Sequence, residues 1–501
     1  MPANAGSDRM TPEISFDNSY ARLPDRFYAR VDPVTVAAPR LIRVNVALAE
    51  ALGLDPVALA SPDGVQALAG NVVLAGSQPL AAAYAGHQFG HFSPQLGDGR
   101  ANLLGEVVTP SGLRRDIQLK GSGRTPFSRG GDGRAGLGPI LREYIVSEAM
   151  AALGVPTTRA LAAVATGEAV YRETTVPGAV LTRVAASHIR VGTFQYFAAR
   201  GDGEAVRLLA DHAIARHYPE AAAAANPYRA LLDGVVTAQA GLIARWLLIG
   251  FIHGVMNTDN CAVSGETIDY GPCAFMDVYD PAKVFSSIDQ NARYAYGNQP
   301  RIAVWNLARL AETLLPLLHD NEDAAVDSAK DALAGFSVHF EPAYFGGLGR
   351  KIGLSGQRDG DEALVNDLLK IMAENDADFT LTFRRLCDAA ADPGGEAALR
   401  AELTNPAAID SWLTRWRWRL GDEAAAPQAI RDAMRAVNPA VIPRNHLVEA
   451  ALNAAIEQDD FAPFDEIMAA LGRPFEDIER FALYAVPPLP EQRVRQTFCG
   501  T

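Results

Sequence analysis

Two short segments, residues 253–260 and 266–271, carry the residue types best suited to chemistry in this chain. They run His-Gly-Val-Met-Asn-Thr-Asp-Asn and Glu-Thr-Ile-Asp-Tyr-Gly, and they bring Asp259, Asn260 and Asp269 close together in the sequence. Mg²⁺ binds through one or two carboxylates and leaves room for phosphate oxygens. The segments therefore predict a nucleoside-triphosphate site. We expect the first to be a loop after an apolar helix, and the second to be a short strand that ends in a glycine turn.

The composition indicates a soluble globular protein with more than one lobe. The 501 residues are 49% hydrophobic and 21% charged, and the formal charge is −14. A strongly negative chain does not favour broad binding to nucleic acid or anionic membranes, although it allows a local basic pocket. We see no apolar run long enough to cross a bilayer and no signal segment at the N-terminus. These features predict a cytoplasmic protein with neither nucleic acid nor membrane as a partner.

Two strand-like segments, residues 102–108 and 115–120, lead to Lys120. The second alternates apolar and polar residues as a half-buried strand does. The arrangement resembles the upper sheet of a kinase, in which a turn approaches the phosphates and a strand lysine reaches them. The turn before these strands is not the usual GxGxxGxV loop and offers only Gly97-Asp-Gly99. An ordinary hairpin turn explains that short sequence about as well.

Residues 121–134, directly after Lys120, interleave glycines with arginines. Such a segment is unsuited to a strand or a helix. Its backbone amides and guanidinium groups can instead form a cradle for anions. We therefore favour a phosphate-binding loop over the alternative of a flexible surface loop.

A helix is predicted for residues 139–153, because Pro139 suits its first turn and Gly154 its end. In a kinase-like lobe, one glutamate of this helix pairs with the strand lysine. Both Glu143 and Glu148 are candidates, and either could equally be a solvated helix charge. A hairpin is predicted for residues 169–184; Arg183 lies near its end, and Arg190 follows it. We expect them to face the cleft, with surface cations as the alternative.

The rest of the chain supplies the framework. Residues 1–70 are predicted to be a packing extension, with a modest helix over residues 40–50. An apolar helix over residues 239–252 leads to the first catalytic segment. Beyond residue 302 we expect amphipathic helices, broken at residues 346–347 and 393–395. The predicted domains are a kinase-like N-lobe (71–200), a kinase-like C-lobe with the catalytic and metal loops (201–345), and a helical C-terminal extension (346–501).

Several blocks, in this order, resemble the selenoprotein O family of kinase-fold proteins. The resembling blocks are residues 84–91 (Tyr-Ala-Gly-His-Gln-Phe-Gly-His), 119–126 (Leu-Lys-Gly-Ser-Gly-Arg-Thr-Pro), 257–260, 269–276 and 293–300. The resemblance implies an α+β, two-lobed protein-kinase-like fold with a β-rich N-lobe and a large helical C-lobe. It also implies a pseudokinase that binds ATP in a flipped orientation and transfers AMP to Ser, Thr or Tyr hydroxyls of proteins, with release of pyrophosphate. UMP transfer from UTP is a further implied reaction, and Mg²⁺ or Mn²⁺ is the implied metal.

The resemblance assigns roles to individual residues. Asp259 becomes the proton acceptor, Asn260 and Asp269 the metal ligands, and Glu143 the partner of the strand lysine. The implied ATP contacts are Gly97, Gly99, Arg100, Lys120, Asp132, Gly133, Arg183, Arg190 and Asp269.

Position 255 separates this chain from ordinary kinases. The catalytic loop of small-molecule kinases resembles His-Gly-Asp followed by Asn, and here Val255 occupies the place of the base aspartate. Valine cannot accept a proton, so phosphoryl transfer through that position is disfavoured. Protein adenylyl transfer is the favoured function. A kinase that uses Asp259 as a displaced base and a catalytically silent nucleotide-binding scaffold are the alternatives.

The C-terminal end departs from the family pattern. Family members often end in cysteine or selenocysteine followed by small residues such as Ser-Ser, whereas this chain ends Phe-Cys-Gly-Thr. We hypothesise a reversible disulfide between Cys273 and Cys499 that ties the tail to the metal loop and regulates access. In the cytosol such a bond is regulatory rather than structural.

Overall fold

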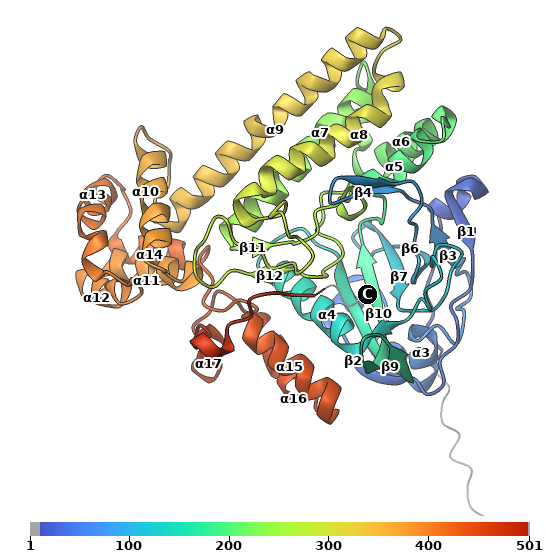
Figure 1. Cartoon of the computed structure of the whole chain (residues 1–501), viewed down its shortest axis with the longest axis horizontal. Helices are drawn as coiled ribbons and strands as arrows, with labels where there is room; N and C mark the ends of the chain where they lie inside the picture. Colours follow the sequence, from blue (N-terminus) through green and yellow to red (C-terminus); the bar gives the residue numbers. More distant parts are fainter. Residues whose placement is uncertain (1–10, 499–501) are drawn as a thin grey trace, which may run out of the picture.

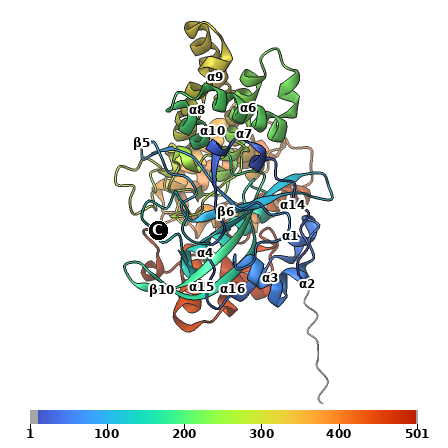
Figure 2. The same ribbon diagram turned by 90° about the vertical axis from the view of Figure 1, so that its right-hand side faces the viewer.

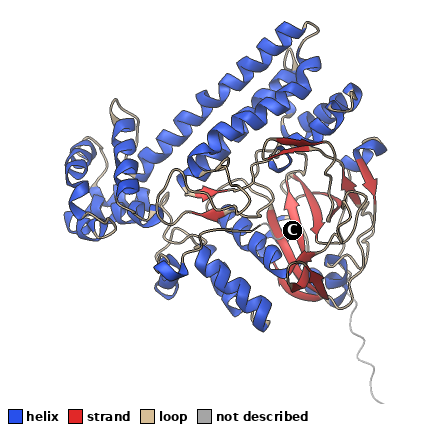
Figure 3. Ribbon diagram, in the orientation of Figure 1, coloured by secondary structure: helices blue, strands red, loops and turns tan. Residues whose placement is uncertain are grey.

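The computed structural model describes residues 11–498, and these form a lobe built on one sheet and a lobe built from helices (Figure 1, Figure 3). Eight strands pair antiparallel in the order β1-β3-β6-β7-β10-β9-β2, and β8 pairs with β10. These strands are β1 (Tyr28–Arg30), β2 (Arg40–Val44), β3 (Leu80–Ala82), β6 (Ala101–Val108), β7 (Arg114–Lys120), β8 (Ala135–Gly136), β9 (Arg159–Tyr171) and β10 (Thr175–Ala185). The predicted strands before Lys120 and the predicted hairpin are confirmed.

The strand register brings two of the predicted cations to one face. Lys120 ends β7 opposite Leu181 of β10. Arg183 lies two residues further along β10, and side chains two residues apart share a face of a sheet. Both cations therefore point to the same side of the N-lobe.

Helices cover both faces of the sheet (Figure 2). One face packs on α1 (Val46–Ala51), α2 (Pro56–Ala60) and α3 (Pro62–Leu68), which precede most of the sheet in sequence. The other face packs on α4 (Leu137–Ala152), and α15 (Asn445–Gln458) and α16 (Ala462–Leu471) pack against α4 in the same core. The C-terminal part of the chain thus returns to support the N-lobe.

The C-lobe is a helical bundle with a continuous apolar core. Its helices are α5 (Val191–Ala198), α6 (Gly203–His217), α7 (Pro227–Leu248), α8 (Gln299–Leu318) and α9 (Glu322–Lys351). Among the described residues, α7 is the one helix long and apolar enough to cross a membrane by length and composition, so the expectation that no segment could do so is wrong on those criteria. However, 61% of the most apolar stretch of α7 is buried, and the helix packs against α6, α8 and α9. It is therefore a core helix of this lobe.

A third group of helices, at the left of Figure 1, has its own core around Trp412 and Trp416. It consists of α10 (Asp361–Glu374), α11 (Phe379–Ala391), α12 (Glu396–Arg400), α13 (Asp410–Leu420) and α14 (Pro427–Arg435), and the short α17 (Ala482–Ala485) follows later in the chain. The expected break at residues 393–395 is confirmed, because a single 3-10 turn there separates α11 from α12.

Two small sheets and a 3-10 turn shape the space between the lobes. The hairpin of β4 (Gly86–Gln88) and β5 (His91–Ser93) lies beside α5 and the 3-10 turn η4 (Thr258–Asn260). β11 (Phe251–Ile252) pairs with β12 (Ala274–Phe275), so the intervening chain forms one long loop. All the residues expected to do chemistry in the C-lobe lie on that loop.

Four local expectations are wrong. The expected helix over residues 239–252 ends at Leu248, and residues 251–252 form β11. Residues 40–44 form strand β2 rather than helix, because they pair with β9. Helix α1 begins at Val46, and the Asn45 side chain caps it by accepting a hydrogen bond from the Leu48 amide. Residues 266–271 form no strand, because Asp269 turns the backbone into the left-handed region with a φ of 61°. Helix α9 runs unbroken through residues 346–347. A Cβ at Gly347 would lie 2.3 Å from Leu248, so this glycine allows close packing of α9 on α7 rather than ending a helix.

Candidate active site

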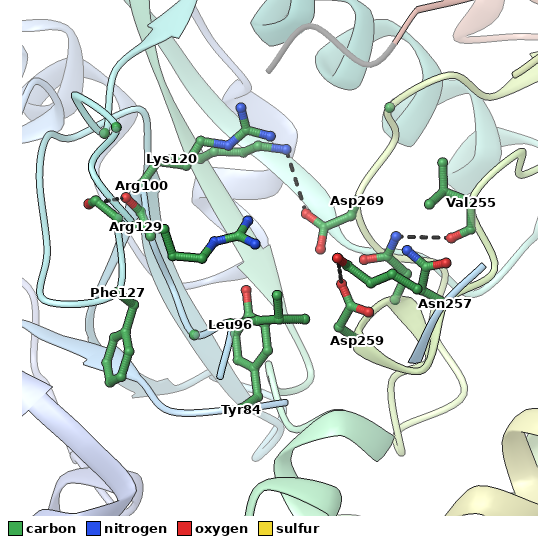
Figure 4. Close-up of a pocket in the computed structure, with 18 of the residues that line it drawn as sticks. Tyr84, Leu96, Arg100, Lys120, Phe127, Arg129, Val255, Asn257, Asp259 and Asp269 are labelled. Atoms are coloured by element: carbon green, nitrogen blue, oxygen red, sulfur yellow. Dashed lines mark hydrogen bonds and ion pairs between the residues drawn. The ribbon is translucent and has the colours of Figure 1, made fainter. Parts of the chain in front are cut away.

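A cavity of about 540 Å³ lies between the sheet and the loop that joins β11 to β12. Its size is in the range typical of small-molecule sites. It is lined by residues of the glycine-rich segments, by the strand lysine and by the catalytic loop (Figure 4). The lining includes the following residues expected from the sequence: Gly97, Gly99, Arg100, Lys120, Asp132, Gly133, Arg190, Asp259, Asn260 and Asp269.

The strand lysine is paired as in a kinase. Lys120 Nζ lies 2.5 Å from Glu143 Oε2 of α4 and 3.5 Å from Asp269 Oδ1. Glu148, the other candidate, instead accepts bonds from Asn45 and Arg159. The alternative left open by the sequence is therefore resolved in favour of Glu143. Burial lowers the pKa of the Lys120 ammonium, whose charge depends on these carboxylates.

Two buried arginines converge with Lys120 on Asp269. Arg183 Nη2 lies 2.6 Å from Asp269 Oδ1 and also 2.6 Å from Glu143 Oε1. Arg190 Nη1 contacts Asp269 Oδ2. Burial alone would raise the pKa of Asp269, but Arg183, Arg190 and Lys120 hold it well below its usual range. Arg190 also lies 4.0 Å from Asp98. Three buried cations thus converge beside the cavity, among the carboxylates of Glu143, Asp269 and Asp98.

Asp259 occupies the opposite side of the site from the strand lysine (Figure 4). Its Oδ2 accepts a hydrogen bond of 3.1 Å from Gln88 Nε2, while its Oδ1 is buried without a partner. A Cβ on Gly86 would lie 2.4 Å from that Oδ1, so the carboxylate packs directly against the glycine backbone. Burial raises the pKa of Asp259 to about 6, against the opposing charge of Arg190. This carboxylate is poised to exchange a proton near neutral pH.

The side chains of Asn260 and Asp269 fit a hard divalent cation. The Asn260 amide nitrogen donates 2.9 Å to the Val255 carbonyl, so its other end, the amide oxygen, remains to bind a ligand. One amide oxygen and one carboxylate match the few ligands that a protein contributes to a Mg²⁺ site, in which phosphate oxygens and water supply the others. Within residues 11–498 no group of three or more His, Cys, Asp or Glu side chains is placed to hold a metal ion. The chain therefore offers a partial metal site of the kind that a nucleotide completes.

The glycine-rich segments are tightly folded rather than loose. Gly97 and Gly133 have φ values of 75° and 69°. A Cβ at Gly97 would lie 2.3 Å from Phe127, and a Cβ at Gly133 would lie 2.1 Å from the Gly123 carbonyl. Asp132 accepts both guanidinium ends of Arg172, at 2.9 and 3.0 Å, and this pairing lowers the pKa of Asp132. The carboxylate thus fixes the loop through Arg172, a residue that no sequence pattern had indicated.

Other residues in the site also escaped sequence reasoning. Gln88 and Tyr84 lie within a block that resembles the family, but their types alone indicate no chemistry. Tyr84 packs its ring 4.7 Å from the Arg190 guanidinium. Asn257 Oδ1 accepts bonds from the Phe89 amide and from the Tyr294 hydroxyl. Each of these contacts joins segments far apart in the sequence.

The C-terminal segment reaches the loop after Asp269. Thr497 donates its hydroxyl to the Pro272 carbonyl at 2.5 Å, and its amide to the Phe285 carbonyl at 2.8 Å. Cys273, the next residue after Pro272, is fully buried, and burial raises the pKa of its thiol to about 12. Cys499, its hypothesised partner, lies outside the described residues.

The fold and this cleft define a nucleotide-dependent transferase of kinase-like architecture. A lysine–glutamate pair, a partial metal site and a buried carboxylate surround one cavity, while Val255 stands where a kinase has its base.

Comparison with known proteins identifies the family. The model of the family described as protein adenylyltransferase SelO matches residues 11–472. The protein nucleotidyltransferase YdiU of Methylorubrum extorquens (strain PA1) is 66% identical over 498 residues, which is 98% of this chain and 100% of the relative. The proteins of the same name from Bradyrhizobium diazoefficiens and Rhodopseudomonas palustris (strain BisB5) are each 64% identical over 492 residues, with the same coverage. The chain belongs to the SelO family and is a protein nucleotidyltransferase that transfers AMP. The resemblance found in the sequence is confirmed.

Proposed function

We propose that the cavity binds ATP together with Mg²⁺ or Mn²⁺, and that Asp259 accepts the proton of a target Ser, Thr or Tyr hydroxyl as AMP is transferred. Attack at the α-phosphorus forms the new phosphodiester and breaks the bond to pyrophosphate, which leaves. UTP serves as a second donor, and the reaction takes place in the cytoplasm.

The observation that carries this proposal is the convergence of three buried cations beside the cavity. Lys120 and Arg183 contact Glu143 and Asp269, and Arg190 contacts Asp269 and lies 4.0 Å from Asp98. Fixed cations in a site with little water stabilise negative charge far better than exposed ones do. The β- and γ-phosphates gain charge as pyrophosphate leaves. Cations held deep in the site therefore suit transfer of AMP, in which these two phosphates form the leaving group.

Asn260 and Asp269 would hold the metal through one oxygen each. A bound Mg²⁺ or Mn²⁺ neutralises phosphate charge and orients the phosphates for in-line attack. The protein contributes the orientation of these two ligands. The Val255 carbonyl fixes the Asn260 amide, and Arg183 and Arg190 fix the Asp269 carboxylate.

Asp259 is the residue suited to act as the base. It lines the cavity, and unlike Asp269 it is not held by three cations. Its pKa of about 6 leaves it ionised at neutral pH yet basic enough to accept a proton. The valine at position 255 offers no proton acceptor. The conventional kinase geometry therefore lacks its base, while a carboxylate four residues later remains available.

The tail is the proposed regulatory element. Contacts of Thr497 with Pro272 and Phe285 bring the C-terminal segment to the residue before Cys273. A Cys273–Cys499 disulfide would fasten it there. Because the buried Cys273 thiol is protonated at neutral pH, we expect this bond to form slowly under mild oxidation. Non-reducing peptide mapping tests it, and absence of the crosslinked peptide after oxidation would contradict it.

One experiment tests the donor and the metal together. Purified protein is incubated with a protein acceptor and ATP or UTP, with Mg²⁺, Mn²⁺ or a chelator, and the mass added to the acceptor is measured. We expect AMP or UMP addition that requires a divalent metal. Asp269→Ala should abolish it, whereas Asp367→Ala, which removes an exposed carboxylate on α10, should not. Metal-independent transfer, or full activity in Asp269→Ala, would contradict the metal assignment.

A further inference from the structure

Two arginine side chains lie over one tryptophan ring next to the catalytic loop. The Arg293 guanidinium carbon is 4.7 Å from the ring centre of Trp305, and that of Arg309 is 5.0 Å from the same ring. Arg293 comes from the loop before α8, while Trp305 and Arg309 lie four residues apart on α8 itself. We call Arg293, Trp305 and Arg309, together with His87 and Phe92, the Trp305 cluster.

The cations of this cluster are incompletely paired. Nε and Nη2 of Arg293 and Nε of Arg309 are shielded from water without a hydrogen-bond partner. Arg309 makes one ion pair, with Glu312 at 2.6 Å, in which the carboxylate is half exposed. No carboxylate between residues 11 and 498 lies within ion-pair distance of Arg293. Two guanidinium groups with one half-exposed carboxylate partner leave positive charge unbalanced, so this site is suited to an incoming anion.

Aromatic side chains border these cations. His87 lies with its ring centre 5.2 Å from that of Trp305 and 4.8 Å from that of Phe92. Phe92 is 40% exposed at the surface. Burial lowers the pKa of His87, and the charges of Arg309 and Arg293 lower it further, so the ring is neutral at neutral pH. The cluster thus combines two cations with an aromatic surface, a combination enriched at protein–protein contacts.

The β4–β5 hairpin links the cluster to the catalytic loop through consecutive residues. Gln88 donates to Asp259, and the next residue, Phe89, donates its amide to Asn257. The following residue, Gly90, packs on Arg293, since a Cβ there would lie 3.6 Å from the guanidinium carbon. An extended polypeptide advances only about 3.3 Å per residue. A target chain whose hydroxyl reaches Asp259 can therefore extend along this hairpin to the cluster beyond it.

We propose that the Trp305 cluster docks an acidic segment of the target protein, next to the hydroxyl that receives AMP. A guanidinium stacked on an aromatic ring keeps its edge available for paired hydrogen bonds to a carboxylate. Glutamate or aspartate side chains beside the acceptor balance the positive charges of Arg293 and Arg309. This inference rests on the proposed transfer to protein hydroxyls and adds the class of sequence that is selected.

Peptides of one length and composition test the proposal on the full chain. They carry the acceptor hydroxyl flanked by glutamates, by lysines or by phosphoserines, and a second set replaces the acceptor residue with alanine so that binding is measured without chemistry. Fluorescence anisotropy gives Kd, and AMP incorporation gives kcat/KM. Arg309→Ala is the principal variant because it lies on the helix surface. Arg293→Lys keeps the charge but removes the planar edge, and Arg350→Ala, an exposed arginine at the end of α9, is the control.

We expect the glutamate peptide to bind about tenfold more tightly than the lysine peptide, a difference of about 1.4 kcal/mol, and less so at high salt. Arg309→Ala and Arg293→Lys should each remove most of that preference, and Arg350→Ala should retain it. Equal affinities for the two peptides, or an undiminished preference in Arg309→Ala, would overturn the proposal. A phosphoserine peptide that binds tenfold more tightly than the glutamate peptide would also overturn it, in favour of phosphate recognition. Binding preference without AMP transfer to any peptide would contradict the proposed function and leave the docking inference standing.

Discussion

The side-chain amide of Gln88 donates a hydrogen bond of 3.1 Å to Oδ2 of Asp259, across 171 residues of sequence. Gln88 belongs to a short hairpin, and Asp259 to the loop that carries the proposed metal ligands. The bond fixes one oxygen of the carboxylate and leaves the other, Oδ1, without a partner. Gln88 is therefore a positioning residue for the proposed base, and its removal should change the acid–base behaviour of the enzyme.

Gln88→Leu should move the pH dependence of AMP transfer. The amide stabilises the ionised form of Asp259, and a hydrogen bond to a charged group contributes about 1.5–3 kcal/mol. Loss of this hydrogen bond raises the pKa of Asp259, so the low-pH midpoint of the kcat profile should rise by about one pH unit or more. A pH–rate profile measures this. Gln95→Ala removes an exposed glutamine on the loop after β5 and should leave the profile unchanged. A variant with reduced kcat but an unmoved midpoint would show that Gln88 acts only on the fold.

The wild-type enzyme should lose activity as the pH falls through about 6. Burial raises the pKa of Asp259 to about 6, and a general base works only when deprotonated, so activity is present above that pH and lost below it. The rate of AMP transfer at saturating ATP measures the effect, and ATP affinity measured at the same pH values separates it from binding. A rate that stays level down to about pH 5 would exclude Asp259 as the base.

Gly86→Ala should displace the base without removing it. The added Cβ would meet Asp259 Oδ1 at 2.4 Å, so the carboxylate must shift. Misplacement of a reacting group by about 1 Å can cost about 100-fold in rate. We expect a large fall in kcat with ATP affinity retained. Gly203→Ala at the start of α6, where a Cβ meets nothing within 4 Å, is the matched control. Normal kcat in Gly86→Ala would show that the contact does not position the base.

Arg190→Lys should weaken ATP use although it preserves the charge. Arg190 contacts the Asp269 carboxylate and also donates 2.6 Å to the backbone carbonyl of Asp259, which a lysine cannot do with the same geometry. We expect kcat/KM for ATP to fall by a factor on the order of 10–100, the equivalent of one or two charge-assisted hydrogen bonds. Steady-state kinetics with ATP varied provide the test. Arg350→Ala serves as the control, and an unchanged kcat/KM in Arg190→Lys would remove Arg190 from the nucleotide site.

The sequence predicted the elements whose signals are local. Alternation predicted the strands around Lys120, and helical spacing with a proline start predicted α4. Sequence alone left Glu143 and Glu148 equivalent. The choice depends on which turn of α4 faces the end of β7, and that orientation is set by packing of the whole lobe.

Contacts between distant segments explain what the sequence missed. Gln88 gains its role only because the β4–β5 hairpin meets η4, and Arg172 only because β9 ends beside the glycine-rich loop. Gly347 indicates a helix break when judged by propensity, yet it serves close packing on Leu248. In each case the role of the residue depends on contacts with a distant segment, which its own type and neighbours in sequence do not indicate.

The most direct test of the central claim uses ATP labelled at either the α- or the γ-phosphate, with Mg²⁺ and a protein acceptor. The cations around Asp269 and the absence of a base at Val255 predict that label reaches the acceptor only from the α-position, with pyrophosphate released. Asp259→Asn should lower that incorporation by a factor on the order of 10²–10⁴. Label transferred only from the γ-position would contradict the account and identify a kinase that uses a displaced base.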